Sequence, residues 1–287
     1  MNNPVYHIKE LACQYSIGSE PVLRIEELNL YEGEIVFFVG ASGVGKSTLL
    51  ETLGLMNNTI DFHSSGEFWF ETYDNRVDLR DIWKQSEKEL SKFRQENLSF
   101  IFQSTNLFPN LSAFENVLLT QIVEGKSYDE ASKNAKSMIY RLFPNQRDRD
   151  EIIEDGKAIM ELSGGQRQRL AFVRAAISKY AILLADEPTG NLDWWNAKNL
   201  VEILVEKVKS EEGVTVIVSH DINLATEYGD RIVLIKKEFR DPQDESSSFG
   251  VLNNKGVFTR NDENWVNNEG SSLSKDELSN YLKDQLK

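Results

Sequence analysis

The sequence predicts an α/β protein built around a parallel sheet, and three observations support this. Residues 34–39, 181–185 and 214–219 are short apolar runs, as expected for strands buried on both faces. A helical pattern at residues 194–209 separates the last two runs, which gives a strand–helix–strand unit. The first run leads directly into a glycine-rich loop and a second helical pattern, residues 46–55.

The other expected elements surround this sheet. Residues 5–15 and 22–30 are predicted to be strands joined by a turn, which gives an antiparallel part at the N-terminus. Beyond about Arg240 the composition becomes polar, and a small hairpin is expected from residues 249–252 and 256–260. The remaining expectations are helices at 79–94, 114–123, 128–142 and 166–178, strands at 98–102 and 233–235, and a final helix after Ser274 with Leu278, Leu282 and Leu286 on one face.

Length and composition limit the class of protein. The 287 residues suffice for a substantial core, and 40% hydrophobic with 27% charged residues is typical of a soluble globular chain. No apolar run reaches the roughly 18 residues of a membrane span. The N-terminus does not resemble a signal peptide and Cys13 is the single cysteine, so a cytosolic chain is expected. A net charge of −14 argues against nucleic acid as a partner and against adsorption to anionic lipid.

Residues 40–48 fit the phosphate-loop pattern G-x-x-x-x-G-K-[ST]. Glycines let the backbone curl so that its N–H groups converge on phosphate oxygens, and the following helix adds its positive N-terminal end. Lys46 is expected to reach the β- and γ-phosphates, and the Ser47 hydroxyl to ligate Mg²⁺. A chance glycine turn is the alternative, but the preceding strand and following helix favour an ATP-binding loop. The expected nucleotide-binding residues here are Gly40, Ser42, Gly43, Gly45, Lys46, Ser47 and Thr48.

Two carboxylates end the apolar run at residues 181–185. Ligands of open α/β sheets bind at the carboxyl ends of the strands. Asp186 is therefore predicted to hold Mg²⁺, directly or through water, and Glu187 to orient or deprotonate the attacking water. The alternative is that the two carboxylates are simply solvated at the end of a strand. The presence of a phosphate loop in the same sequence makes this alternative the less favoured one.

A third motif is Leu162-Ser163-Gly164-Gly165-Gln166. Ser163 can cap the helix that starts near Gln166, and the paired glycines expose backbone N–H groups. These features make a second anion site possible. The residues alone leave open a simple glycine-rich helix start.

Together the three motifs resemble the ATP-binding subunit of an ABC transporter. Residues 162–166 match the family signature letter for letter, and the motifs follow the family's order and spacing from about residue 5 to 235. The resemblance implies a RecA-like P-loop NTPase core, an N-terminal antiparallel β part and an inserted α-helical subdomain at about 83–178. It places this ABC-type domain at 1–240 and leaves 241–287 as a C-terminal extension.

The resemblance also implies roles that spacing cannot show. Family members form head-to-tail dimers, so Ser163, Gly165 and Gln166 would contact ATP held by the other chain. Gln103 would sense Mg²⁺ and the attacking water, His220 would contact the γ-phosphate, and Tyr15 would stack on adenine. On residue type alone these could be a surface glutamine, a structural histidine and a core tyrosine. The other two histidines, His7 and His63, match nothing in the family and are interpreted as structural.

Residues 187–193 and 111–117 resemble a subgroup typified by lipoprotein-release, macrolide-export and cell-division ATPases. That subgroup implies an ATPase that lies on the cytoplasmic face of the membrane and drives a polytopic permease for export or extraction. It also implies a dimer with a second ATP-binding subunit, here expected to be a second copy of the same chain (a homodimer). A non-transporting ATPase that signals to a membrane partner is the alternative. A soluble ABC ATPase is a further one, but those usually carry coiled-coil inserts or fused units, which this chain lacks.

Four segments depart from the family pattern. Trp194 and Trp195 follow the D-loop, residues 191–193, where small or polar residues are usual. They are interpreted as helix packing, with a dimer or partner contact as the alternative. Residues 145–160 are long and acidic, and residues 103–114, where relatives meet the membrane subunit, suggest unusual partner choice. The tail at 241–287 is either a docking or regulatory element or an edge cap.

Overall fold

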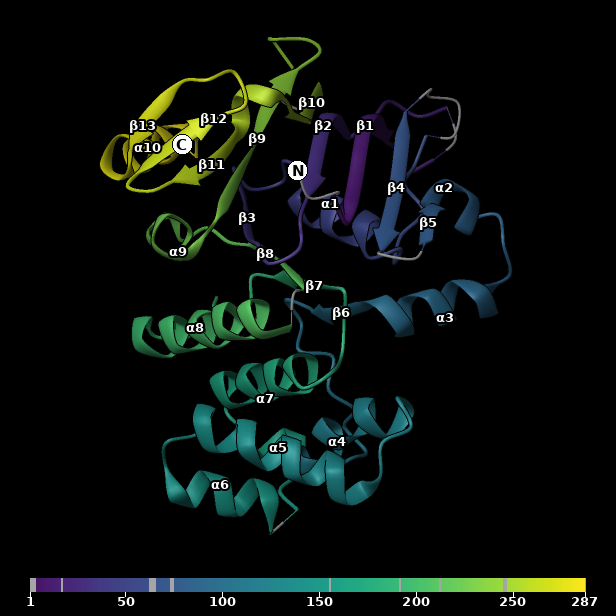
Figure 1. Cartoon of the computed structure of the whole chain (residues 1–287), viewed down its shortest axis with the longest axis vertical. Helices are drawn as coiled ribbons and strands as arrows, with labels where there is room; N and C mark the ends of the chain where they lie inside the picture. The colour runs from purple at the N-terminus through teal and green to yellow at the C-terminus, as the bar shows by residue number, and fades with distance from the viewer. Residues whose placement is uncertain are drawn as a thin grey trace.

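The computed structural model describes residues 4–16, 18–61, 66–72, 75–154, 156–190, 192–211, 213–244 and 247–286. Within these residues one sheet runs in the order β5-β4-β1-β2-β10-β9-β3-β8-β7-β6, and β11, β12 and β13 branch from β9 (Figure 1). The strands are β1 (Tyr6–Cys13), β2 (Leu23–Leu30), β3 (Ile35–Gly40), β4 (Glu67–Thr72), β5 (Asn75–Asp78), β6 (Leu98–Ile101), β7 (Ile182–Asp186), β8 (Val214–Val218), β9 (Arg231–Phe239), β10 (Ser248–Leu252), β11 (Val257–Asn261), β12 (Asn264–Asn267) and β13 (Ser272–Ser274).

Helices cover both faces of the central strands. These are α1 (Lys46–Leu53), α2 (Leu79–Ile82), α3 (Glu87–Asn97), α4 (Ala113–Val123), α5 (Tyr128–Leu142), α6 (Gln146–Ile153), α7 (Gly164–Ala176), α8 (Trp194–Glu211), α9 (Ile222–Tyr228) and α10 (Lys275–Gln285), with short 3₁₀ turns at Ile159–Glu161 and Asn254–Gly256. None of the described helices is both long enough and apolar enough to cross a bilayer.

The parallel core predicted from the three apolar runs is present. Strand β3 pairs in parallel with β8 and β9, and β7 pairs in parallel with β8 and β6. All six residues of β3 are buried, and the neighbours Phe37 and Phe38 belong to separate apolar clusters. Alternation along a strand sends successive side chains to opposite faces, so one cluster fills each side of the sheet. This is why the run shows no apolar–polar alternation.

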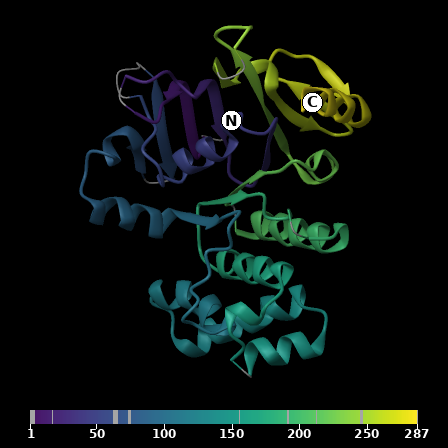
Figure 2. The ribbon, with the colours of Figure 1, turned by 180° about the vertical axis from the view of Figure 1, so that it is seen from behind.

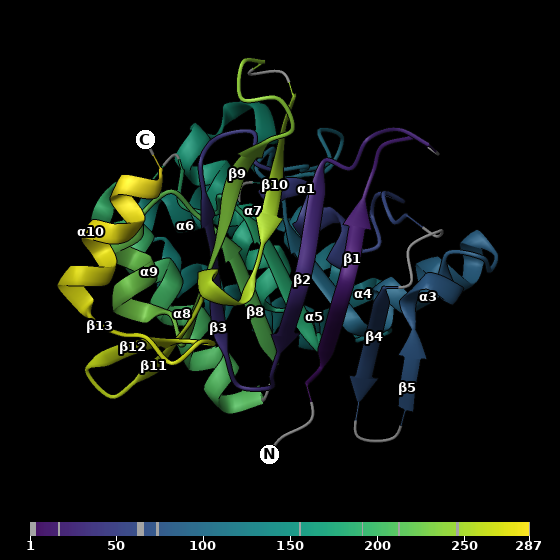
Figure 3. The same ribbon diagram turned by 90° about the horizontal axis from the view of Figure 1, so that it is seen from above.

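The antiparallel part is larger than the sequence indicated. Strands β1 and β2 pair as expected, but β4 and β5 extend the sheet beyond β1 (Figure 3). Phe68 and Phe70 of β4 are buried against Tyr6 of β1. The run of three aromatic residues, Phe68-Trp69-Phe70, is the signal that could have indicated this strand.

A helical subdomain occupies one end of the molecule. Helices α4, α5, α6 and α7 lie together, away from the antiparallel strands (Figure 2). Residues 145–160, which depart from the family pattern, contain α6, capped by Asn145 and anchored by the buried Ile152. The expected insertion at 83–178 also includes β6, which belongs to the central sheet.

The expected C-terminal hairpin is wrong in its position. Strand β10 does not pair with β11; both lie antiparallel along β9, at residues 236–239 and 231–233 respectively. The hairpin is formed by β11 and β12 instead. The reason is that β9 is long and β3 occupies only one of its edges, so the other edge offers β10 and β11 more ladder hydrogen bonds than a two-stranded ribbon would.

Strand β10 joins the two parts of the sheet. It pairs in parallel with β2 and antiparallel with β9, between the N-terminal strands and the core. A Cβ atom at Gly250 would lie 2.1 Å from the Val44 carbonyl oxygen, so the strand packs directly against the glycine-rich loop. We propose that the main domain extends to Leu252, beyond residue 240, and that the extension begins there.

Candidate functional site

The glycine-rich loop between β3 and α1 has a backbone that requires its glycines. Gly43 and Gly45 have φ of 74° and 95°, a region that disfavours side chains. A Cβ at Gly40 would lie 2.6 Å from the Ile235 carbonyl oxygen. The loop therefore curls between β9 and the start of α1, where a helix N-terminus attracts anions.

Lys46 is buried across the mouth of this loop. Its ammonium Nζ donates hydrogen bonds to the carbonyl oxygens of Gly40 at 2.9 Å and Ala41 at 2.8 Å. Burial lowers the pKa of Lys46, and the nearby carboxylates of Glu187 and Asp186 oppose that shift. The ammonium is thus held at the loop by peptide oxygens, where a bound phosphate could accept its hydrogen bonds.

Asp186 ends β7 beside the same loop. Burial raises its pKa, and a hydrogen bond with the Ser47 side chain works in the opposite direction. These two oxygen ligands from different elements suit Mg²⁺, which needs only one or two protein carboxylates because substrate phosphates and waters complete its shell. Among the described residues, no group of three or more His, Cys, Asp or Glu side chains is placed to hold a metal ion. Ser47 and Asp186 are thus the residues here that could hold a magnesium ion.

Glu187 adopts a strained backbone conformation that aims its side chain at its neighbours. Its φ is 47°, and its amide donates to the Val218 carbonyl at 3.0 Å. One carboxylate oxygen lies 2.8 Å from His220 Nε2, and the other accepts a 3.3 Å hydrogen bond from Gln103 Nε2. Gln103, Glu187 and His220 follow the adjacent strands β6, β7 and β8, so their meeting is a consequence of the parallel sheet.

Gln168 also holds Glu187, a contact that the sequence motifs did not indicate. Its side-chain amide donates to the Glu187 carbonyl oxygen at 3.2 Å, and the residue is buried in α7. A polar residue two positions beyond the glycine-rich helix start was the available signal. It links α7, and therefore the signature, to the end of β7.

Tyr15 is exposed at the other side of the loop. The residue is 62% exposed, and its hydroxyl forms a 2.8 Å hydrogen bond with Thr48 Oγ1. The core-packing alternative is therefore wrong. An open aromatic face next to α1 is available to a planar ligand.

Ser163 begins α7 as the residue pattern indicated. Its hydroxyl accepts from the Gln166 amide at 3.2 Å, and the Gln166 side chain accepts from the Ser163 amide at 2.8 Å, which is a capping box. A Cβ at Gly164 would meet no atom within 4 Å, so the space beside this turn is open. Within the described part of the chain, no hydrogen bond joins Ser163, Gly165 or Gln166 to residues 40–48.

Two further expectations have different outcomes. His7 bonds Asn29 at 2.6 Å and lies 3.5 Å from Glu67, so it links three antiparallel strands in a structural role. His63 and the D-loop residue Asn191 lie outside the described residues. The packing interpretation of the indole pair is wrong: Trp194 is 45% and Trp195 74% exposed, because both lie on the outer side of the first turn of α8, whereas Ala197 in the same turn is buried in the core.

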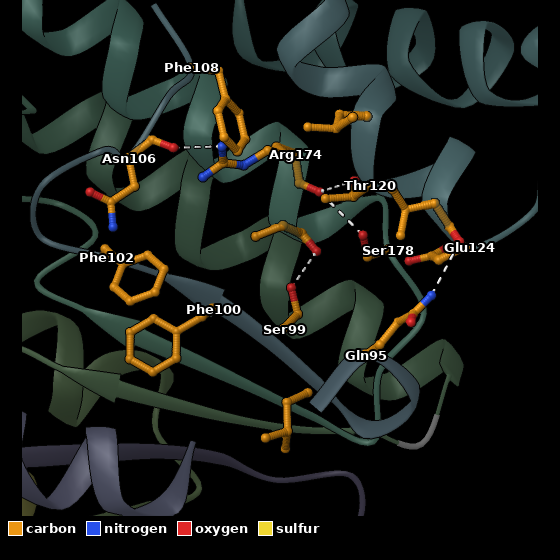
Figure 4. A pocket seen from close by; sticks show the side chains of 14 residues that line it. Gln95, Ser99, Phe100, Phe102, Asn106, Phe108, Thr120, Glu124, Arg174 and Ser178 are labelled. Carbon is orange, nitrogen blue, oxygen red and sulfur yellow. Dashed lines mark hydrogen bonds between the residues drawn. The ribbon is translucent and has the colours of Figure 1, made fainter. Parts of the chain in front are cut away.

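A second feature is an apolar groove of about 440 Å³ between β6, α4 and α7 (Figure 4). Phe100 and Phe102 stack at 4.2 Å between ring centres, and Phe108 is half exposed at the opposite side. Arg174, buried at the groove wall, donates to the carbonyl oxygens of Asn106 at 2.8 Å and Thr105 at 3.2 Å. The segment after Gln103 is thus fixed by α7 and presents aromatic surface.

The fold and the geometry at the ends of β3, β6, β7 and β8 define a P-loop nucleotide-binding protein. The most specific evidence is the combination of the curled loop, the buried Lys46 and the Ser47–Asp186 contact.

Comparisons with known proteins narrow this class. A family model described as ABC transporter matches residues 23–190. The chain is 36% identical over 227 residues to the lipoprotein-releasing system ATP-binding protein LolD of Idiomarina loihiensis, covering 78% of this chain and 92% of that protein. It is 37% identical to the macrolide export ATP-binding/permease protein MacB of Campylobacter jejuni, covering 77% of this chain and 31% of that protein. The solved dimeric structure of MJ0796, a bacterial ABC transporter cassette, matches with a TM-score of 0.67 and 33% identity over 80% of this chain and 93% of that one.

The chain therefore belongs to the ABC transporter family. It is an ATP-binding, ATP-hydrolysing cassette of the subgroup that includes LolD and MacB, and a second MJ0796 structure, at 31% identity, represents a post-hydrolysis state with ADP and Pi. The predicted family and fold class are confirmed.

Proposed function

We propose that the chain hydrolyses ATP at the loop with Glu187 as the general base. The observation that carries this proposal is the position of the Glu187 carboxylate, held between His220 and Gln103 and within electrostatic reach of Lys46. Lys46 and the loop amides bind the phosphates, and Tyr15 stacks on the adenine. Glu187 takes a proton from the attacking water, while His220 orients the carboxylate and contacts the γ-phosphate.

In this proposal Ser47, Asp186 and Gln103 would hold Mg²⁺ at the same site. When bound, the cation would neutralise charge on the phosphates. Asp186 is buried enough to raise its pKa, so a cation that replaces its missing solvation stabilises the ionised carboxylate.

The protein works as a head-to-tail homodimer with two ATP molecules between the chains. Ser163, Gly165 and Gln166 of one chain bind the γ-phosphate held by the loop of the other. Support comes from the open space beside Gly164 and from the dimeric MJ0796 cassette. The exposed Trp194–Trp195 pair, directly after the D-loop, contacts the second copy. Because ATP contacts both halves only when they are closed, its binding favours closure and loss of the γ-phosphate favours opening.

The closing motion drives a separate polytopic permease. A helix of that subunit occupies the groove lined by Phe100, Phe102 and Phe108, next to Gln103. The chain is then peripheral, on the cytoplasmic face of the membrane. The relatives' names, a lipoprotein-releasing system and a macrolide exporter, support export or extraction from the membrane.

Purification of the tagged chain from membranes, together with ATPase assays, tests this proposal. We expect a polytopic membrane protein to be recovered with the wild-type chain, and Phe102→Glu/Phe108→Glu to abolish recovery while ATP binding persists. A chain that is recovered without any polytopic partner contradicts the transport proposal.

A further inference from the structure

Helix α9 begins directly after the histidine that contacts Glu187. Asp221 caps it by accepting from the amides of Asn223 at 2.9 Å and Leu224 at 3.1 Å. The helix has seven residues, too few to be stable in isolation. Its position, and with it the path of the chain at His220, therefore depends on the elements that hold α9.

One side of His220 is fixed by the sheet. Strand β8 is paired on both edges, and the Ser219 amide donates to the Phe38 carbonyl at 3.2 Å. On its other side His220 is connected to α9, a helix that lies outside the sheet. Only the cap residue Asp221 separates His220 from the first residue of α9. A shift of α9 would therefore move the imidazole of His220 relative to Glu187.

Arg260 of β11 holds the far end of α9. Its Nη2 donates to the carbonyl oxygens of Thr226 at 2.8 Å and Glu227 at 2.9 Å, which belong to the last turn of the helix. Carbonyls in a last turn have no partner within the helix, and a positive charge there is favourable. The Arg260 amide also donates to the Asp230 carbonyl at 2.8 Å, which ties β11 to the residue that leads into β9.

The C-terminal extension in turn fixes Arg260. The buried Trp265 of β12 places its ring 5.0 Å from the guanidinium carbon. Leu278 and Leu282 of α10 are fully buried in the same apolar cluster as Ile222 and Ala225 of α9. Helices α9 and α10 lie side by side in two perpendicular views (Figures 1 and 3).

We propose that Arg260 is a positioning residue for ATP hydrolysis: with residues 253–286 it clamps α9 and thereby holds His220 against Glu187. This inference rests on the proposed roles of Glu187 and His220. It assigns the extension a task inside its own chain, through the end of α9 opposite the histidine.

The first experiment compares Arg260→Met with Arg260→Lys and with a matched control. Arg149 also donates to two carbonyl oxygens at a helix end, those of Phe143 and Pro144, and lies 5.1 Å from the Tyr140 ring, but at α5. We expect Arg260→Met to lower kcat about tenfold with KM for ATP within about twofold, and Arg260→Lys to recover most of kcat. Arg149→Met should leave both constants within about twofold at a similar loss of thermal stability. Equal kcat values for Arg260→Met and Arg149→Met would overturn the inference.

The second experiment separates this inference from the proposed function on which it rests. In a His220→Ala background, Arg260→Met should change kcat by less than about twofold, because the clamp then has nothing to position. An undiminished tenfold loss in that background would show that Arg260 acts elsewhere. If His220→Ala alone leaves kcat unchanged, the role of His220 in the proposed function fails as well. Amide hydrogen exchange of residues 222–228 gives an independent readout: it should accelerate in Arg260→Met and not in Arg149→Met.

Discussion

The phosphate-loop region and the signature region of this chain differ in how their functional groups are held. At the loop, Lys46, Asp186 and Glu187 are held by partners from several elements: the end of β3, helix α1, and the segments that follow β6 and β8. At the signature, Ser163 and Gln166 bond to each other, and the turn beside them is open. One region is a nearly complete nucleotide site, whereas the other is a helix N-terminus without a ligand. The difference supports our proposal that the second region completes a site on another chain.

The largest effect is expected from removing the lysine. Lys46→Ala should weaken ATP binding roughly a hundredfold or more, since a hydrogen bond to a charged group contributes about 1.5–3 kcal/mol and Lys46 can make several to phosphate. Titration with a fluorescent ATP analogue measures this. Lys92→Ala, at an exposed lysine of α3, is the control and should bind normally. Normal binding by Lys46→Ala would mean that the loop is not the nucleotide site.

The next largest effect concerns the base. Glu187→Gln keeps the residue's size but removes the carboxylate, so we expect ATP binding to persist and kcat to fall on the order of a hundredfold or more. Steady-state ATPase assays and size-exclusion chromatography in Mg·ATP give the two readouts, and the second should show an accumulated dimer. Turnover at the wild-type rate would disprove the assignment of the base.

Two serines with the same local geometry sharpen the comparison. Ser163 and Ser86 each cap a helix within a capping box. Replacing either by alanine should cost about 1 kcal/mol of stability, because the same kind of cap is lost. Only Ser163→Ala should also lower ATP turnover, while its affinity for ATP as a monomer stays unchanged. Equal turnover in Ser163→Ala and Ser86→Ala would reduce the signature to an ordinary helix cap.

The smallest effect is expected at the exposed indole. Trp195→Ala should change stability by less than about 0.5 kcal/mol, as is usual for exposed positions. It should nevertheless weaken the ATP-driven dimer several-fold when dimerisation is measured by analytical ultracentrifugation in a Glu187→Gln background. Tyr128→Ala, at another exposed aromatic, is the control. If both variants dimerise equally, Trp195 has no part in the contact with the second copy.

The sequence predicted the parts of this molecule that follow from local pattern. The buried runs, the loop glycines and the acidic pair each show themselves within a few residues, and the family resemblance added Gln103 and His220. Long-range packing could not be predicted from local pattern. Strand β10 inserts between β2 and β9, so the hairpin forms from β11 and β12 and not from β10 and β11. Gln168 was missed because its partner is a backbone carbonyl 19 residues away. The indole pair was misjudged because residue type alone does not show which side of a helical turn faces the core: Ala197 is buried there, whereas Trp194 and Trp195 are exposed.

Mixing two inactive variants tests the composite site most directly. Lys46→Ala lacks a working loop but keeps its signature, and Ser163→Arg blocks its signature but keeps its loop; both are made in a Glu187→Gln background. In Mg·ATP neither should dimerise alone, and a differently tagged mixture should form a heterodimer, because one loop then faces one intact signature. Recovery of one variant on the other only in Mg·ATP is the predicted result. A mixture that stays as monomeric as the separate variants would contradict the claim that two chains share each ATP.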